Sequence, residues 1–186
     1  MSIDGILTTT GVTSEVFNDS EELEGHILLA DYDSTDGCSY DMMLEDIINL
    51  DGITVLLESS KNSYHVWNLT VRGEKEALAA KADLHDDAKH LKIGWRRGRW
   101  TLRLTGKHSI DGSEYKSAPQ IRRVIGNATD KPQSEAHFKL LKALAEKQEF
   151  DLGVSEDSYE FTGAEASTEQ YMTVVDDLKD FGGSED

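Results

Sequence analysis

A short apolar run that ends in two aspartates decides the fold: His26-Ile27-Leu28-Leu29-Ala30-Asp31-Tyr32-Asp33. The run has the length of a buried strand, and it stops in a polar turn. Residues two apart on a strand point to the same face, so Asp31 and Asp33 share one. The stretch therefore predicts a strand that presents a pair of carboxylates at its end.

The residues that follow predict a helix and then a hairpin. Apolar residues at helical spacing between Met42 and Leu50, closed by Asp51-Gly52, indicate the helix. Ile53 to Leu57 and Ser63 to Val71 are strand-like, and the polar stretch Ser59-Ser60-Lys61-Asn62 lies between them. We expect these two strands to pair.

A second helix and a second hairpin complete the predicted unit. Glu74 to Leu84 is rich in strong helix formers. Leu91 to Trp95 and Trp100 to Leu104 alternate and flank Arg96-Arg97-Gly98-Arg99, which is typical of a hairpin. The order β-α-β-β-α-β with an extra strand predicts an α+β, RRM/ferredoxin-like core, whose helices cover one sheet face and leave the other available.

One domain with two flanking segments accounts for the 186 residues. Residues 1–25 show no sustained period, so we expect a loosely packed N-terminal arm that could add an edge strand. Residues 26–150 form the α+β domain, in which we expect a long loop over 105–130 and a C-terminal helix over 134–147. Residues 151–186 are acidic, and we expect a partly disordered tail with one strand near Tyr159-Glu160-Phe161.

The net charge of −17 is unevenly distributed along the chain. Residues 89–123 contain ten basic and two acidic residues, which leaves −25 for the rest. Such an acidic composition is similar to that of proteins from salt-loving archaea. The chain lacks an apolar run of membrane-spanning length and a secretory signal, and it has a single cysteine, Cys38. We therefore expect a cytoplasmic protein that does not bind membranes.

Two groups of polar side chains, one on the first strand and one on the first hairpin, could bind a ligand or a metal ion. Asp31 and Asp33 could hold a divalent cation such as Mg²⁺ or Mn²⁺ together with substrate phosphates. Ser63 and His65 share a face of the second hairpin strand, so His65 could contact a triphosphate oxygen with Ser63 in support. The alternatives are an acidic turn in a very acidic protein and a strand histidine in an ordinary polar network.

The basic segment predicts a nucleic-acid-binding surface. Its arginines could contact phosphates, and its tryptophans could stack on bases. The alternative is a pair of core tryptophans, with the basic residues paired to the acidic surface. The residues predicted to bind nucleic acid are Arg96, Arg97, Arg99, Trp100 and Lys107, with Trp95 as a second indole.

In this order, the pieces resemble the archaeo-eukaryotic primase superfamily, the catalytic fold of small primase subunits and primase-polymerases. Ile27 to Asp33 looks like the family's Asp-hydrophobic-Asp motif at a strand end. Glu58 to Trp67 is similar to its second motif, Ser-x-His after a hairpin turn, and Thr101 to Lys107 to its Leu-Arg-Leu-Pro-Gly segment, with Thr105 in place of proline. The resemblance covers residues 26–107.

The resemblance implies a primase or polymerase that transfers nucleotides from triphosphates on a single-stranded template, alongside other replication proteins. Asp31 and Asp33 would hold the Mg²⁺ or Mn²⁺, and Ser63, His65 and Arg103 would contact the nucleotide. A third carboxylate would complete the metal set, and the family's position for it falls on Asp87 or Asp86. A catalytically inactive, nucleic-acid-binding module and a structural or partner-binding protein remain the alternatives.

Overall fold

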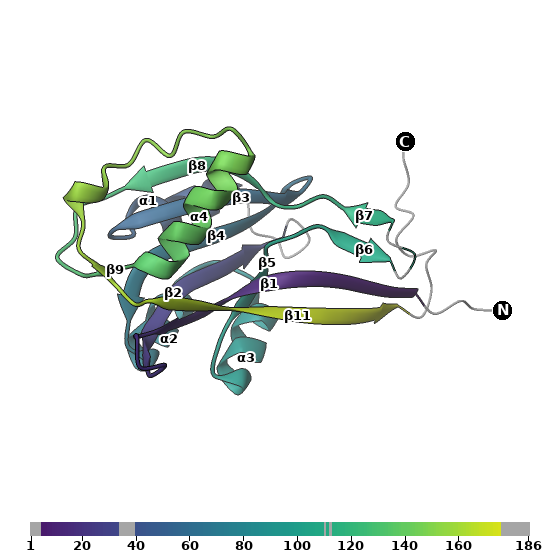
Figure 1. Cartoon of the computed structure of the whole chain (residues 1–186), viewed down its shortest axis with the longest axis horizontal. Coiled ribbons are helices and arrows are strands. Elements are labelled where there is room, and N and C mark those ends of the chain that lie inside the picture. The colour runs from purple at the N-terminus through teal and green to yellow at the C-terminus, as the bar shows by residue number, and fades with distance from the viewer. Residues whose placement is uncertain (1–4, 34–39, 110, 112, 176–186) are drawn as a thin grey trace.

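A mostly antiparallel sheet carries four helices in the computed structural model, which describes residues 5–33, 40–109, 111 and 113–175 (Figure 1). The helices are α1 (Tyr40–Ile48), α2 (Glu74–Ala82), α3 (Ala88–Arg97) and α4 (Glu135–Lys147). The strands are β1 (Gly5–Phe17), β2 (Leu23–Tyr32), β3 (Ile53–Ser60), β4 (Ser63–Arg72), β5 (Thr101–Arg103), β6 (Lys107–Ser109), β7 (Glu114–Lys116), β8 (Gln120–Gly126), β9 (Gln133–Ser134), β10 (Phe161–Thr162) and β11 (Glu165–Val175). This architecture confirms the predicted α+β class.

The centre of the sheet consists of β3, β4 and β2, in that spatial order. The chain runs from β2 through α1 into β3, and β4 returns between them, antiparallel to both. Leu29 is paired with Trp67 and Asp31 with His65, so the apolar middle and the polar ends of the two strands coincide. The structure therefore confirms the first predicted strand as β2 and the first predicted hairpin as β3 and β4. It also contains the two predicted helices, as α1 and α2.

The predicted second hairpin is wrong, because its first strand is part of helix α3. Asp87 is the N-cap, and its side chain accepts a hydrogen bond from the Lys89 backbone N–H. Gly98 ends the helix in the left-handed conformation at φ 73°. The alternation of Leu91, Ile93 and Trp95 suggested a strand, but the cap residues on either side are helix signals that override it.

The N-terminal segment differs from the predicted loose arm, since β1 is a long strand inside the sheet. It pairs with β2, β5, β6 and β11. Val12 and Val16 are fully buried, and so is Ser14 between them. Threonine and serine at strand positions hid the apolar alternation. The predicted strand at 100–104 exists as β5, but it pairs with β1 and not with its predicted partner at 91–95.

The C-terminal segment also contributes to the sheet. Strand β11 runs antiparallel to β1, from Phe17 opposite Glu165 to Gly5 opposite Val175. The strand predicted near Tyr159 to Phe161 lies at β10, and the predicted loop at 105–130 contains β6, β7 and β8. The rest of the predicted tail, residues 176–186, lies outside the described residues.

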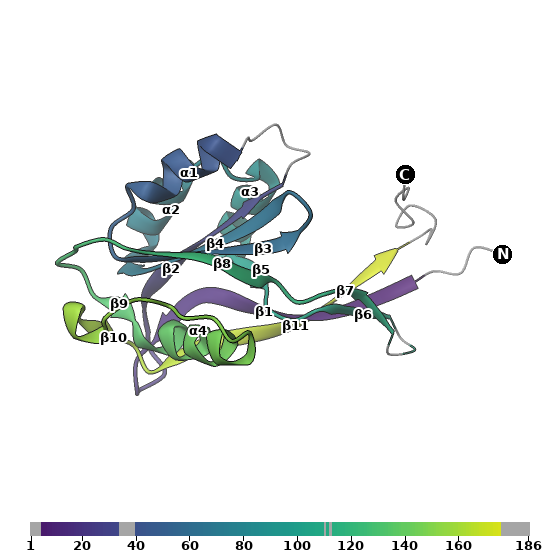
Figure 2. The ribbon, with the colours of Figure 1, turned by 90° about the horizontal axis from the view of Figure 1, so that it is seen from above.

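Helices cover both faces of the central strands. Figure 2 shows α1, α2 and α3 on one side of the sheet and α4 on the other. The predicted C-terminal helix is confirmed as α4, and its Phe138 and Leu141 are buried in the main core with Trp67 and Leu29. Because α4 packs there, part of the face expected to be free is covered, and Asp31 and His65 lie on this face at the strand ends.

Gly94 allows α3 to lie directly on the buried ring of Trp100. A Cβ atom at Gly94 would overlap the indole side chain, whereas one at Gly73 would meet nothing within 4 Å. We predict that Gly94→Ala lowers the free energy of unfolding by about 1–3 kcal/mol, because overpacking forces the ring or the helix to move. Gly73→Ala is the matched control and should change it by less than about 1 kcal/mol. Urea denaturation checks both, and equal effects would contradict the packing described.

Candidate functional site: an acidic and basic cleft at the ends of β2 and β4

The predicted acidic pair and the predicted histidine lie on one face of two neighbouring strands. Asp31 is the register partner of His65, and His65 Nε2 lies 3.8 Å from Asp31 Oδ1. Ser63 Oγ donates a hydrogen bond of 3.2 Å to Asp33 Oδ1. The strand pairing thus brings together Asp31, Asp33, Ser63 and His65, as expected from their spacing.

These side chains line a cleft of about 230 Å³. The residues around it are Asp31, Asp33, Ser59, Ser60, Ser63, His65, Thr101, Leu102, Arg103, Lys107 and Lys116. Arg103 and Lys107 were predicted from sequence, whereas Lys116 was not. Lys116 reaches the cleft because β6 and β7 form a hairpin that pairs it with Lys107, and no local pattern indicated that hairpin.

The imidazole of His65 is a neutral group in this cleft. Burial lowers the pKa of His65 to about 3, the positive charges of Arg103 and Lys107 act in the same direction, and the Arg103 backbone opposes them. Its contact with Asp31 is therefore between a neutral ring and a carboxylate, not a salt bridge. The Nδ1 atom is buried and has no hydrogen-bond partner within the described residues.

Charges of both signs perturb one another across the cleft. Burial is the main cause of the raised pKa of Asp31, and the neighbouring carboxylates Asp87 and Asp33 raise it further. Burial also lowers the pKa of Lys107, with Lys116 and Arg103 adding to the effect. The cleft therefore holds carboxylates beside cations without neutralising either fully, which suits a ligand that itself combines a metal cation with phosphate.

Arg103 is held mainly by backbone carbonyl groups. Its guanidinium donates hydrogen bonds to the carbonyl oxygens of Ser59, Ser117 and Thr105. The residue is only 6% exposed. These contacts tie β5 to the end of β3 and to the segment before β8, so Arg103 shapes the cleft wall and contributes positive potential.

The two candidates for the third metal-binding carboxylate, Asp86 and Asp87, have other partners. Asp86 is buried in an ion pair with Lys81, and His90 lies 3.7 Å from its Oδ2. The Asp87 backbone N–H donates a hydrogen bond of 2.8 Å to the Asp31 carbonyl oxygen, but the Asp87 carboxylate caps α3. Within the described residues, no group of three His, Cys, Asp or Glu side chains is close enough to hold a metal ion.

The residues predicted to bind nucleic acid are divided among four environments. Lys107 lines the cleft, and Arg96 and Arg97 are exposed on α3. Arg99 Nε lies 3.9 Å from Glu15 Oε2. Trp100 is 3% exposed and belongs to the core, so its predicted stacking role is wrong, because its ring packs against Gly94 of α3.

Comparison with family models, curated proteins and solved structures finds no match to this chain. None of the helices in the described part of the chain has the length and apolar character required to cross a membrane.

Asp86 balances a fully buried ammonium group, so its loss should be costly. We predict that Asp86→Ala lowers the free energy of unfolding by about 3–5 kcal/mol, since it leaves Lys81 without its carboxylate partner. The double variant Lys81→Met with Asp86→Leu removes both charges and should recover a large part of the loss. Denaturant titration checks this, and a double variant less stable than Asp86→Ala would refute the buried pair.

The neutral His65 predicts a specific pH dependence of stability. Its folded pKa of about 3 lies below the ordinary 6.5, so below pH 6.5 the unfolded chain takes up a proton that the folded protein does not. Its contribution is complete above pH 6.5 and is lost toward acid at about 1.4 kcal/mol per pH unit. His65→Gln should flatten the fall of unfolding free energy below pH 6.5. His85→Gln, which removes an exposed histidine of raised pKa, should not flatten that fall.

Proposed function

We propose that the protein is a primase-like or polymerase-like replication protein of the cytoplasm, whose cleft binds a nucleoside triphosphate with Mg²⁺ or Mn²⁺ for nucleotidyl transfer on a nucleic-acid template. The observation that carries the proposal is the meeting of Asp31, Asp33 and His65 with Lys107 and Lys116 in one cleft. A carboxylate pair suits a divalent cation, and the cationic wall suits phosphates. The two halves of the cleft together match a metal-bound triphosphate.

The carboxylates fit a divalent cation by their chemistry. Asp31 is partly buried beside Asp33, and that burial and the neighbouring negative charge raise its pKa. A bound cation would relieve both, and Mg²⁺ in nucleotide enzymes is commonly held by one or two carboxylates, phosphates and water. Asp31 and Asp33 would hold the ion, which would supply Lewis-acid stabilisation of charge on the transferred phosphoryl group.

The other side chains of the cleft would position the triphosphate. The ring N–H of neutral His65 can donate a hydrogen bond to a phosphate oxygen without adding charge. Lys107 and Lys116 would attract the phosphates electrostatically, and Ser63 would orient Asp33 through their hydrogen bond. Arg103 would act mainly through its positive potential, because it donates to three backbone carbonyls.

Part of the fold supports the primase-like proposal, and part departs from it. The order β3-β4-β2 with the α1 crossover is that of a split β-α-β unit, in which the acidic pair ends the first strand. The departures are the insertion of α3 and the pairing of β5 with β1. The proposal therefore depends on the cleft more than on the complete topology.

Removal of either carboxylate should stop nucleotide incorporation while the fold is kept. We predict that Asp31→Asn and Asp33→Asn each reduce incorporation on a single-stranded template by roughly a hundredfold or more, because each weakens the electrostatic centre of the site. Asp41→Asn, which changes an exposed carboxylate of α1, is the matched control and should keep full activity. Wild-type protein that incorporates no nucleotide with Mg²⁺ or Mn²⁺, in dilute or concentrated salt, would contradict the proposal.

The carboxylate of Asp87 provides a second test of the metal set. Asparagine also caps helices well, so Asp87→Asn keeps the start of α3 and removes only the charge. With a metal set made of Asp31 and Asp33, we predict incorporation within about threefold of wild type. A fall in activity as severe as in Asp31→Asn would instead assign Asp87 as the third metal ligand.

A second candidate function is nucleic-acid binding without catalysis. The ion pair of Asp86 and the capping role of Asp87 favour it, since neither carboxylate completes the cleft. In that case the Asp31→Asn and Asp33→Asn variants should bind single-stranded nucleic acid as tightly as wild type, and wild type should incorporate nothing.

A further inference from the structure

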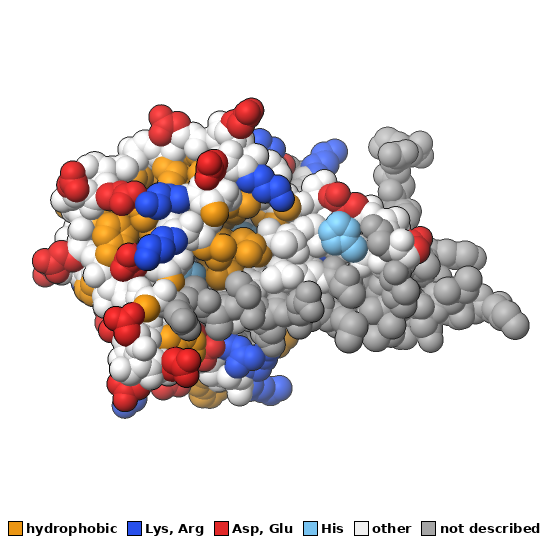
Figure 3. Space-filling model, viewed as in Figure 1, with side chains coloured by type: hydrophobic (Ala, Val, Ile, Leu, Met, Phe, Trp, Pro, Cys, Tyr) orange, Lys and Arg blue, Asp and Glu red, His pale blue; other side chains and the backbone are white. Residues whose placement is uncertain are grey.

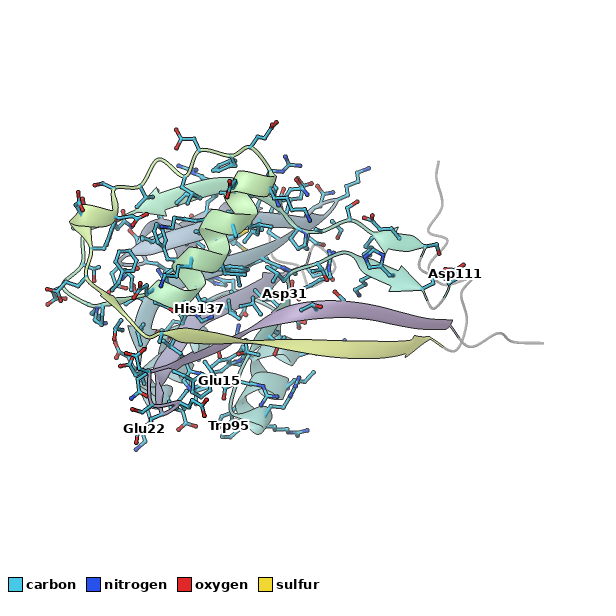
Figure 4. The ribbon with its side chains drawn as sticks, viewed as in Figure 1. Glu15, Glu22, Asp31, Trp95, Asp111 and His137 are labelled. Atoms are coloured by element: carbon cyan, nitrogen blue, oxygen red, sulfur yellow. The ribbon has the colours of Figure 1, made fainter. Side chains whose placement is uncertain are left out.

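Helix α3 presents an exposed tryptophan on a basic surface, away from the cleft. Trp95 is 66% exposed, the largest exposed fraction among the large apolar residues of the described chain, and Ile93 is 55% exposed. Lys89, Lys92 and Arg96 are exposed on the same helix. Figure 4 shows Trp95 at the outer edge of α3, and Figure 3 shows Lys and Arg side chains together at the lower edge where Figure 1 places that helix.

Helical spacing makes these side chains one surface. Lys92 lies three residues before Trp95 and four before Arg96, so both are its neighbours on the helix. Lys89 is in turn three residues before Lys92 and four before Ile93. The indole is thus bordered by cations on its own helix. Gly94 and the partly buried Leu91 face the protein instead.

The cations of this surface lack partners among the described residues, so their charge is available to a ligand. The side chains of Lys89, Lys92 and Arg96 form no hydrogen bond or ion pair with that part of the protein. Elsewhere Lys131, Lys139, Lys142 and Arg122 each pair with a carboxylate. A net charge of −17 offers many carboxylates for pairing. What distinguishes Lys89, Lys92 and Arg96 is that they gather beside an exposed indole on one helix, which suits an anionic partner with a flat apolar group.

We propose that the α3 surface formed by Lys89, Lys92, Trp95 and Arg96 binds single-stranded nucleic acid, with one base stacked on the Trp95 indole and the cations against adjacent phosphates. A flat exposed ring between point charges fits a chain that alternates bases with phosphates. A duplex keeps its base faces stacked inside, and the carboxylate side chains of an acidic polypeptide offer no flat ring to cover the indole.

This inference goes beyond the proposed catalysis, because the surface lies outside the cleft and needs no metal. The two sites are nevertheless connected. Helix α3 begins at Asp87, whose backbone N–H is bonded to the carbonyl oxygen of Asp31. Trp95 is eight residues further, about 12 Å along the helix axis. A strand held on α3 would therefore pass within a few nucleotides of the acidic pair.

Fluorescence anisotropy with a labelled oligothymidylate tests the surface in the full-length protein. Trp95→Leu should weaken binding about tenfold or more, whereas Trp95→Phe, which keeps an aromatic face, should stay within a few-fold of wild type. Lys92→Ala with Arg96→Ala should weaken binding and make it less dependent on salt, by roughly 0.7 in log–log slope for each phosphate that is no longer neutralised. Lys75→Ala with Arg123→Ala removes two exposed cations elsewhere and is the charge-matched control.

Three outcomes would overturn the proposal. In the first, Trp95→Leu and the Lys92→Ala, Arg96→Ala variant bind as tightly as wild type. In the second, the Lys75→Ala, Arg123→Ala control loses as much affinity as the Lys92→Ala, Arg96→Ala variant. In the third, polyglutamate competes as strongly as unlabelled oligonucleotide. Asp31→Asn should bind the oligonucleotide normally, so failure of catalysis and failure of this surface are separable. Quenching of tryptophan emission on binding should disappear in Trp95→Leu, because Trp67 and Trp100 are buried.

Discussion

The buried ammonium group of Lys81 is the contact on which the arrangement of the cleft depends. Lys81 is completely buried, and burial lowers its pKa while Asp86 opposes that effect. Its Nζ donates to the Leu29 carbonyl oxygen of β2 at 2.7 Å, to Asp86, and to His90 Nδ1 of α3 at 3.1 Å. His90 Nε2 donates in turn to the Thr101 carbonyl oxygen of β5. One charge therefore joins the strand that carries Asp31, two helices and the strand that carries Arg103.

That network also explains why the cleft keeps charges of both signs. With Asp86 committed to Lys81 and Asp87 to the cap of α3, the acidic side of the cleft consists of Asp31 and Asp33. Arg103, Lys107 and Lys116 form the other side, and the charges of Arg103 and Lys107 favour a neutral His65. A cleft with two carboxylates and three cations is better suited to a metal-bound phosphate than to a metal ion alone.

The sequence predicted local features well and long-range pairing poorly. The ends of β2 and β4 were predictable, because strand alternation alone places Asp31, Asp33, Ser63 and His65 on one face. The length and the inner position of β1 were missed, since its buried threonines and serine do not show an apolar period and three of its four partners, β5, β6 and β11, are distant in sequence. Trp95 and Trp100 were expected to share one role, but Trp95 is exposed on helix α3 and Trp100 is buried, and only tertiary packing shows that Gly94 covers Trp100. Lys116 required the β6–β7 hairpin.

The central claim is that the cleft recognises a metal ion and a triphosphate together. Isothermal titration of the wild-type protein with a nucleoside triphosphate, in the presence and absence of Mg²⁺, tests it most directly. The account predicts binding that requires Mg²⁺, is abolished in the Asp31→Asn, Asp33→Asn double variant and is weakened when Lys107 and Lys116 become alanine. Absence of binding in Mg²⁺, or binding that is the same without the ion and in the double variant, would contradict it.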